Sequence, residues 1–185
     1  MANDAGILSY GAYLPRRRLQ RKSIAAANSW FAPGLRGLAK GERAMANWDE
    51  DTVTMAVEAA RDCLTGLPPP GLEQLMLAST THPFDDRQNS AIIANALHLA
   101  SSLRVLDVTG SQRAGTSALI SALAGGSKSL VTAAEHRLAK AASPQEMHFG
   151  DGAAALLVGK GTPIARLIGA HSETVDFVHQ FRSSE

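Results

Sequence analysis

Cysteine is almost absent from this chain, and the typical signs of a metal site are absent too. Cys63 is the one cysteine among 185 residues, so neither a disulfide within the chain nor a cysteine cluster for a metal can form. This usage suits a reducing compartment, and we expect a cytoplasmic protein. The six histidines are scattered, without a pair or an acidic neighbour at metal-ligand spacing, so we expect no metal site. Cys63 lies in a helical pattern and is predicted to be a small core residue.

Long apolar runs and an excess of one charge are also missing. No apolar run reaches the roughly 18 residues that span a bilayer. The N-terminal stretch MANDAGILSYG lacks the basic and apolar regions of a secretory signal. A net charge of +1, from 18 basic and 17 acidic residues, gives no bulk attraction for nucleic acid or an anionic membrane. We therefore expect neither partner.

The basic residues form one cluster near the N-terminus. It consists of Arg16, Arg17 and Arg18, with Arg21 and Lys22 just beyond. Two interpretations remain open, because such a cluster forms either a solvated loop or a site for an anionic group of a ligand.

Strand-type apolar runs alternate with helical patterns along the chain, in which 45% of the residues are hydrophobic. The predicted strands are 7–14, 75–79, 104–108, 129–134 and 153–158, with 165–170 pairing with the last, and the predicted helices are 19–28, 47–64, 90–99 and 114–124. This alternation predicts one α/β domain over residues 1–185, with a mostly parallel sheet and an antiparallel edge. Residues 30–47, rich in glycine and basic side chains, are predicted to be an irregular surface excursion.

The segment VLDVTGSQRAGTSALISAL, residues 105–123, joins a strand to a helix of small residues. The helix carries no charge after Arg113, and a helix without a polar face is predicted to be buried on all sides. Its positive N-terminal end is aimed at Gln112, where a cysteine thiolate would be stabilised. The junction is typical of an enzyme nucleophile, but the amide of Gln112 cannot attack a substrate.

A second marker is FGDGAAALLVG, residues 149–159. Gly150 and Gly152 bracket Asp151 immediately before a strand-type run. Taken alone, the segment predicts a tight turn in which the glycines supply positive φ and Asp151 bonds to the backbone.

Four segments together resemble the thiolase superfamily, and most of all the branch that holds hydroxymethylglutaryl-CoA synthase and 3-oxoacyl-[acyl-carrier-protein] synthase III. The segments are GAYLPRRRL, NWDEDTVTMAVEAA, DVTGSQRAGTSAL and FGDGAAALLVG, in the order of the family and across essentially the whole chain. The resemblance implies the N-terminal half of a two-half α/β fold. That half has a mixed, mostly parallel five-stranded sheet, helices on both faces and a buried central helix.

The resemblance also implies that a C-terminal half, with the active-site His and a second His or Asn, is absent from residues 1–185. The apolar residues Phe177, Val178 and Phe181 have little chain left to cover them. A chain that is a fragment of a longer protein is therefore one hypothesis.

Two positions depart from the family pattern. The family's catalytic Cys falls on Gln112, and the acid–base Glu of hydroxymethylglutaryl-CoA synthases falls on Thr80. The synthase III branch has no Glu there, so Thr80 excludes only the first chemistry, whereas Gln112 excludes acyl-enzyme formation in both. In related condensing domains a Gln in place of the Cys marks decarboxylation of malonyl-type thioesters, which would still need the missing His.

The resemblance implies a binding site for CoA as well. Trp30 and Arg36 lie where synthase III enzymes hold CoA, and Arg16 with the two arginines after it is a lesser candidate for the CoA phosphates. His82 follows the position-80 site and is predicted to hydrogen-bond there. The alternatives are that Trp30 is a packing residue and that His82 is a structural histidine with satisfied hydrogen bonds.

Two functional hypotheses follow. The first is an acyltransferase-like domain of lipid metabolism that acts on thioesters of CoA or of an acyl-carrier protein and needs no bound cofactor. The alternative is a non-catalytic subunit that stabilises or regulates an active partner, and whether the chain is itself an enzyme stays open. In both, we expect a homo- or hetero-oligomer with a C-terminal thiolase half. The family dimerises largely through the strand after the nucleophile helix, here about residues 129–134.

Overall fold

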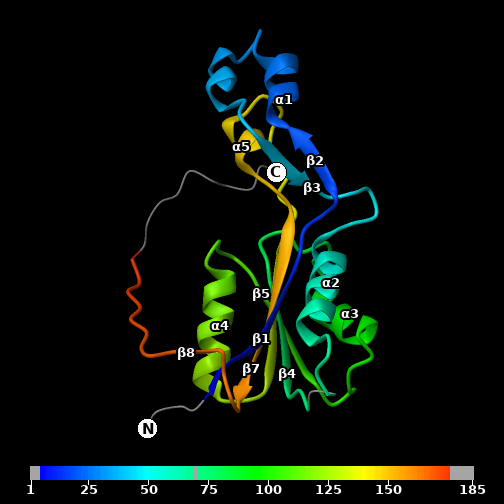
Figure 1. Ribbon diagram of the computed structural model, residues 1–185, viewed down its shortest axis with the longest axis vertical. Helices are drawn as coiled ribbons and strands as arrows, with labels where there is room; N and C mark the ends of the chain where they lie inside the picture. Colours follow the sequence, from blue (N-terminus) through cyan, green and yellow to red (C-terminus); the bar gives the residue numbers. More distant parts are fainter. Residues whose placement is uncertain (1–4, 69–70, 176–185) are drawn as a thin grey trace.

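One mixed sheet with helices on both faces forms the body of the protein (Figure 1). The computed structural model describes residues 5–68 and 71–175, so Phe177, Val178 and Phe181 lie outside the described residues. The strands of the main sheet are β1 (Ala5–Tyr13), β4 (Gln74–Ala78), β5 (Arg104–Val108), β6 (Ser129–Glu135), β7 (Gly152–Lys160) and β8 (Ala165–Arg166). They are ordered β5-β4-β6-β7-β1-β8.

The directions of the strands confirm a mixed, mostly parallel sheet. β5, β4 and β6 are parallel to one another, while β7 is antiparallel to both β6 and β1. Within the described residues, four of the six strands of this sheet, β5, β4, β6 and β1, therefore share one direction. The sixth strand, β8, was expected to pair with β7 but pairs with β1. That expectation is wrong because both edges of β7 are already hydrogen-bonded to β6 and β1.

A small lobe stands at one end of the body (Figure 1). It is built from β2 (Arg17–Gln20), β3 (Glu42–Met45), α1 (Arg21–Asn28), the 3-10 helix η1 (Pro33–Leu38) and α5 (Pro144–His148). The helix expected from residue 19 begins at 21, because Leu19 and Gln20 pair with Arg43 and Glu42 in the β2–β3 ribbon. The excursion expected over residues 30–47 is thus more ordered than its composition suggested, and α5 was not predicted.

The three helices of the body are α2 (Thr52–Leu64), α3 (Asn89–Ala96) and α4 (Ala114–Gly125). α2 and α3 lie on one face of the sheet and α4 lies on the other (Figure 1). The Asp51 side chain caps α2 by accepting a hydrogen bond from the Thr54 amide, and the Thr54 hydroxyl accepts one from the Asp51 amide. This reciprocal pair satisfies two amides that the helix leaves unpaired at its start.

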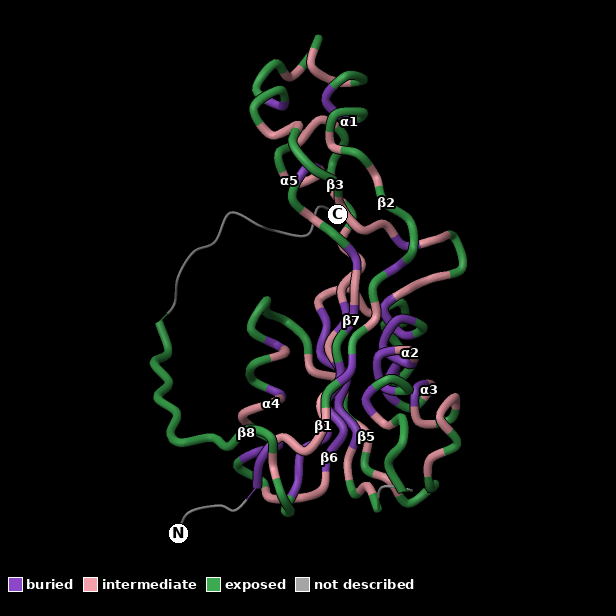
Figure 2. Tube along the Cα trace, viewed as in Figure 1, coloured by how far each residue is buried: buried purple, intermediate pink, exposed green. Residues whose placement is uncertain are grey.

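Alternate side chains of the strands supply the two cores. Leu75 and Leu77 of β4 pack in the cluster beneath α2 and α3, whereas Met76 and Ala78 pack in the cluster beneath α4. This is the two-residue period of a strand covered on both faces. Buried residues accordingly concentrate along the sheet and α2 (Figure 2). Cys63 is 1% exposed in the first cluster, which confirms it as a core residue.

α4 buries only one face within the described residues. Ala114, Ala118 and Ala122 pack on the sheet, while Thr116 and Ser117 on the opposite side are exposed. The expectation of a helix buried on all sides is therefore wrong for this structure. The three alanines recur at the four-residue spacing of one helix face, and that face alone meets the sheet.

β6 lies in the interior of the sheet, hydrogen-bonded to β4 along one side and to β7 along the other. A strand with both edges paired offers no backbone edge to a second subunit. A dimer contact at residues 129–134 would therefore not add a strand to β6, and the expected contact itself stays a prediction.

α2 approaches β1 closely at Gly11, and this contact depends on the missing side chain. A Cβ atom on Gly11 would lie 2.2 Å from the Cys63 amide nitrogen and 2.5 Å from the Ala59 carbonyl oxygen. Both are backbone atoms of α2, so neither can move aside alone. Gly11 therefore sets the distance between helix and sheet.

Replacement of this glycine tests the close approach. We expect Gly11→Ala to lower the free energy of unfolding by about 2 kcal/mol or more, because overpacking must shift α2 from β1. Urea unfolding followed by circular dichroism measures the loss. Gly34→Ala is the control, since no atom lies within 4 Å of the added carbon there. Equal stability of the two variants would contradict the account.

Asp107 on β5 holds the N-terminus of α3. Its carboxylate accepts hydrogen bonds from the Asn89 amide at 2.7 Å and from the Ser90 amide at 2.8 Å. Burial, the largest influence, raises the pKa of Asp107, but the hydrogen bonds from Ser90 and Asn89 together lower this pKa below its ordinary value of 3.8. A carboxyl whose pKa is lowered by folding stabilises the fold above its unfolded pKa, and this stabilisation is lost as the pH falls through the folded pKa.

The variant Asp107→Ala tests this cap. At pH 7 we expect it to unfold more readily than the parent by about 1 kcal/mol, the usual size of a helix-cap contribution. The difference should shrink once the pH falls below about 4, because the parent carboxyl then becomes protonated. Urea midpoints between pH 7 and pH 2.5 measure both effects, with the exposed Asp86→Ala as control. A difference that does not change with pH would contradict the charged cap.

Candidate active site

Four chain segments meet at one edge of the sheet. β4, β5 and β6 are parallel, so their carboxyl ends lie at the same edge, and the antiparallel β7 begins there. Thr80 follows β4, Gln112 follows β5, Glu135 ends β6 and Asp151 precedes β7. The carboxyl edge of parallel strands is where α/β folds commonly bind ligands. We therefore place the candidate site at this edge.

Gln112 lies in the turn between β5 and α4, as the sequence predicted. Gly110 enables this turn with a φ of 87°, and the Ser111 side chain accepts a hydrogen bond from the Arg113 amide at 3.1 Å. No side chain caps the start of α4, and its first turn carries no acidic residue. The positive end of this helix is thus open beside Gln112, where it can stabilise negative charge on a ligand.

Thr80 is bonded to a carboxylate that sequence reasoning missed. Its amide donates to Oε1 of Glu135 at 2.8 Å, and its hydroxyl donates to Oε2 of Glu135, also at 2.8 Å. Thr81 adds a third hydrogen bond to Oε2 at 3.3 Å. One signal could have found Glu135: it is the acidic residue at the carboxyl end of a predicted buried strand, next to the strand that leads to Thr80.

A cavity of about 320 Å³ contains both Gln112 and Glu135 in its wall. Its other lining residues are Leu14, Ala78, Ala114, Gly115, Ala133, Ala134, Gly152, Ala153 and Ala154. The wall is thus made of alanine and glycine with one leucine, and its polar side chains are those of Gln112 and Glu135. Small side chains leave room for a ligand, and Glu135 is the one ionisable group in this wall.

Hydroxyl groups extend the contacts of Glu135 toward α2. The Thr52 hydroxyl donates to the Thr81 carbonyl at 2.7 Å, and the Thr81 amide donates to the Ser79 hydroxyl at 2.9 Å. The Thr81 hydroxyl also accepts from the His136 amide at 3.0 Å. These bonds fix the backbone after β4 against both α2 and β6, so that Thr80 has little freedom of movement.

Asp151 joins the site to the lobe. It is 5% exposed, accepts the Ala46 amide at 2.7 Å and lies 3.3 Å from Nδ1 of His136. A hydrogen bond between Asp151 and the backbone was expected, but the amide that donates it, that of Ala46, is distant in the sequence. The expected positive φ at Gly150 and Gly152 is wrong, because neither residue has one. Gly152 instead allows a close approach, since a Cβ there would lie 3.0 Å from the Leu14 side chain.

His82 lies in a second cavity, next to the first. That cavity has a volume of about 470 Å³ and is lined by Thr80, His82, Asp107, Thr109 and the loop residues 84–89. Nε2 of His82 is buried without a hydrogen-bond partner among the residues that the structure describes. The structure therefore supports neither the expected hydrogen bond at position 80 nor the alternative of a satisfied structural histidine.

The predicted CoA-binding residues lie on the lobe or beside it, and none lines the cavity of Gln112. Trp30 is 82% exposed and tilted against Phe31, with ring centroids 5.8 Å apart. The alternative that Trp30 is a packing residue is therefore wrong. Arg36 is exposed on η1, and Trp30 just precedes η1, so the structure leaves both side chains accessible on one lobe.

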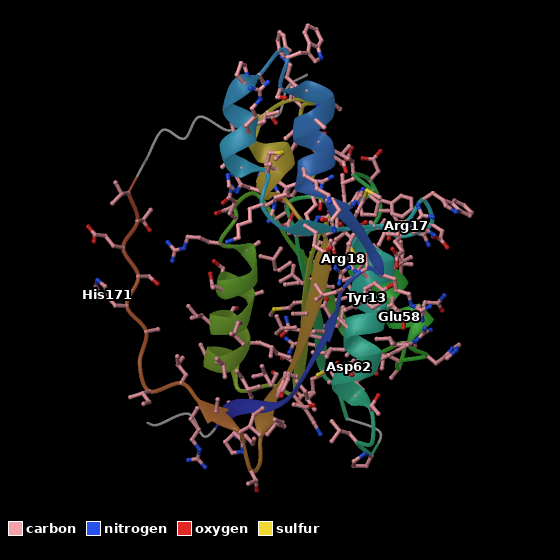
Figure 3. The ribbon with its side chains drawn as sticks, turned by 45° about the horizontal axis from the view of Figure 1, so that its top comes forward. Tyr13, Arg17, Arg18, Glu58, Asp62 and His171 are labelled. Carbon is pink, nitrogen blue, oxygen red and sulfur yellow. The ribbon has the colours of Figure 1, made fainter. Side chains whose placement is uncertain are left out.

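The basic cluster divides into free and engaged side chains. Arg18 donates to the carbonyls of Pro15 and Arg17 and lies 3.7 Å from Glu42. Arg16 and Arg17 are exposed. Figure 3 shows Arg17 and Arg18 on the side of the molecule that carries α2, with α4 on the opposite side. This cluster is thus not brought together with Gln112, and its assignment to CoA phosphates stays a prediction.

Within residues 5–68 and 71–175, no group of three or more His, Cys, Asp or Glu residues is placed to hold a metal ion. In the same part of the chain, no helix is both long and apolar enough to cross a bilayer.

Comparison with known proteins gives consistent relatives. The chain is 31% identical over 183 residues to the hydroxymethylglutaryl-CoA synthase of Methanocaldococcus jannaschii, covering 93% of this chain and 52% of the relative. It is 35% identical over 117 residues to that of Methanosarcina mazei, covering 62% of this chain and 34% of the relative. No family model matches.

Solved structures agree with these relatives. PksG, a hydroxymethylglutaryl-CoA synthase from Bacillus subtilis, superposes with a TM-score of 0.75 at 26% identity, over 85% of this chain and 40% of that one. The priming β-ketosynthase of the R1128 polyketide pathway superposes with a TM-score of 0.71 at 26% identity, over 86% of this chain and 51% of that one. The chain belongs to the thiolase superfamily. These relatives and structures come from one branch of the superfamily, and the chain spans about half the length of the curated relatives it matches.

The helix end beside Gln112 can be probed with a thiol. In Gln112→Cys we expect alkylation by iodoacetamide at pH 7 about tenfold faster than in Thr162→Cys, because a helix N-terminus favours the thiolate. Thr162 is exposed in the turn between β7 and β8, away from any helix start, and buried Cys63 should stay unmodified in both. Mass spectrometry of quenched samples gives the rates. Equal rates would show that α4 does not activate this position.

Proposed function

We propose that this chain forms the thioester-binding half of a condensing-type acyltransferase of the thiolase superfamily. The thioester would be one of CoA or of an acyl-carrier protein, and Gln112 would let the site bind it without becoming acylated. One observation carries the proposal: Gln112 occupies the strand–helix junction in the wall of a cavity built from alanine and glycine. This family's branch acts on thioesters, and the chain keeps its scaffold while changing the reactive residue.

The chemistry of the cavity suits a bound thioester. The Gln112 amide offers two N–H donors and a carbonyl acceptor. It can therefore hydrogen-bond the carbonyl oxygen or the sulfur atom of a thioester without reacting. The uncapped start of α4 favours negative charge on the same oxygen. These groups bind and polarise a carbonyl, which supports thioester binding over a purely scaffolding role.

The cavity favours a thioester whose acyl group carries no negative charge. Glu135 lines the cavity, and Thr80 and Thr81 donate three hydrogen bonds to its carboxylate. Like charges held close together oppose one another, so the carboxylate of a malonyl group would be disfavoured. An acetyl-type group therefore fits better than the malonyl decarboxylation that Gln112 alone suggested.

The rest of the active site is proposed to come from a C-terminal thiolase half, either in the same polypeptide or in a partner subunit. Coverage of about half of each relative supports this. In the alternative function, a non-catalytic subunit stabilises or regulates an active partner, and the unreactive amide at position 112 supports it. The low cysteine content supports a cytoplasmic location for either.

Incubation with acetyl-CoA and malonyl-CoA tests the proposal. We expect acetyl-CoA to bind in isothermal titration calorimetry, while intact-mass measurement finds no acyl adduct on the chain, because an amide cannot form the acyl-enzyme. Release of CO₂ from malonyl-CoA would overturn the preference for an uncharged acyl group. A covalent acetyl adduct would overturn the role of Gln112, and a failure to bind either thioester would leave only the non-catalytic subunit.

The CoA-binding surface of the lobe has its own test. We expect Trp30→Ala to weaken CoA binding about fivefold or more, since stacking a base on an aromatic ring contributes about 1–3 kcal/mol. Trp48→Ala is the matched control, because Trp48 is 88% exposed but lies outside the lobe. Calorimetric titration with CoA compares the two. An equal effect in both variants would remove Trp30 from the site.

A further inference from the structure

We propose that Glu135 is the acid–base residue of this cavity, taking a proton from the α-carbon of the bound acyl group and returning it. The inference rests on the proposed thioester-binding function and adds to it a residue and a chemical step. Its starting point is the composition of the cavity wall, in which Glu135 is the one ionisable side chain and Gln112 the one other polar side chain. A proton that leaves a ligand in this cavity has no other acceptor in its wall.

The hydrogen bonds of Glu135 leave one oxygen available. A carboxylate presents about four lone-pair positions. Oε2 accepts from the hydroxyls of Thr80 and Thr81, whereas among residues 5–68 and 71–175 Oε1 accepts from the Thr80 amide alone. One position therefore remains on Oε1, and it is the position at which we place the transferred proton. The three donors also fix the carboxylate in direction, as an acid–base group requires.

Thr80 and Glu135 form a hydrogen-bonded pair in which Glu135, at the end of β6, supplies the carboxylate. The Thr80 hydroxyl lies 2.8 Å from Oε2 of Glu135, so a carboxylate at position 80 would stand against a second carboxylate. Two such groups at this distance cannot both stay ionised. A hydroxyl at position 80 can instead donate a hydrogen bond to Glu135. Threonine at the family's acid–base position is thus compatible with a carboxylate that the neighbouring strand β6 supplies.

The step balances without a further reagent. The C–H bond at the α-carbon breaks, and its electron pair forms the enolate, with negative charge on the thioester oxygen. The proton forms an O–H bond with Oε1 of Glu135, where it exchanges with solvent, and the reverse step returns a proton to the α-carbon. The step would place the negative oxygen toward the uncapped, positive start of α4, whose Ala114 and Gly115 line the same cavity. The base and the stabilising helix end are therefore supplied by different walls of one cavity.

Other titratable groups surround Glu135, but none lines this cavity. His136 directly follows β6 and lies 3.3 Å from the carboxylate of Asp151, which precedes β7. His82, from the loop after β4, lines the adjacent cavity together with Thr80. Glu135 is therefore the member of this group that a ligand in the cavity can contact.

Proton exchange on acetyl-CoA in D₂O tests the step. Proton nuclear magnetic resonance follows the loss of the acetyl methyl signal with the purified full chain, and calorimetry on the same samples measures binding. We expect Glu135→Gln to slow the enzyme-dependent exchange at least a hundredfold, the lower range for acid–base catalysis, with binding kept. Glu73→Gln is the matched control: Glu73 also accepts a backbone amide, that of Lys128, but at the opposite edge of the sheet.

The outcomes separate the two proposals. Binding with exchange that is lost in Glu135→Gln and kept in Glu73→Gln supports the acid–base role. Binding without exchange in the parent, or with equal exchange in Glu135→Gln, overturns that role and leaves the binding function intact. Absence of binding in the parent overturns the proposed function, and the acid–base role with it.

A second pair of variants keeps the carboxylate in place, in case Glu135→Gln does not fold. Thr80→Val removes the hydroxyl donor but keeps the amide donor, whereas Thr80→Ser keeps both. Losing this donor leaves the carboxylate less firmly oriented toward the cavity, so in Thr80→Val the exchange should slow while acetyl-CoA binding is kept. Thr80→Ser should restore the parent rate. Equal exchange rates in Thr80→Val and the parent would contradict the coupling of Thr80 to the acid–base group.

Discussion

The three hydrogen bonds that Thr80 and Thr81 donate to Glu135 hold the site together. They tie the backbone after β4 to the end of β6, and the hydroxyls of Thr52 and Ser79 extend the same contacts to α2. A charged acceptor with several donors makes stronger bonds than neutral groups do. The position of the carboxylate, and with it the shape of the cavity beside Gln112, therefore depends on this one cluster.

The second constraint is the small size of the side chains around that cavity. Ala133, Ala134 and Gly152–Ala154 line it from two adjacent strands, while Ala114 and Gly115 line it from α4. Larger residues would fill the space that an acyl group needs. The absence of a side chain at Gly11 likewise lets α2 approach β1 closely. Small residues thus have two effects, since they leave a cavity open beside α4 and allow a close contact between α2 and the sheet.

Much of the fold could be predicted because its patterns are local. The strand 104–108 was predicted with the bounds of β5, and the helix 114–124 ends within one residue of α4. Both elements were predicted from the spacing of their apolar residues and from the glycines that follow them. The errors arise where pairing partners are distant in sequence: Leu19 was assigned to a helix but pairs with Arg43 in a ribbon, and β8 pairs with β1 rather than with β7. Period alone does not specify which strand lies next to which.

The sequence by itself determined the alternation of strands and helices, the junction at Gln112 and the family resemblance, because these depend on residues that are neighbours along the chain. Only the tertiary structure decided that Glu135 joins Thr80 across 55 positions, that Asp151 reaches Ala46 across 105, and that Trp30 is exposed. Such contacts arise when parallel strands bring their carboxyl ends to one edge. Strand order, which the local sequence does not encode, therefore decided which side chains form the site.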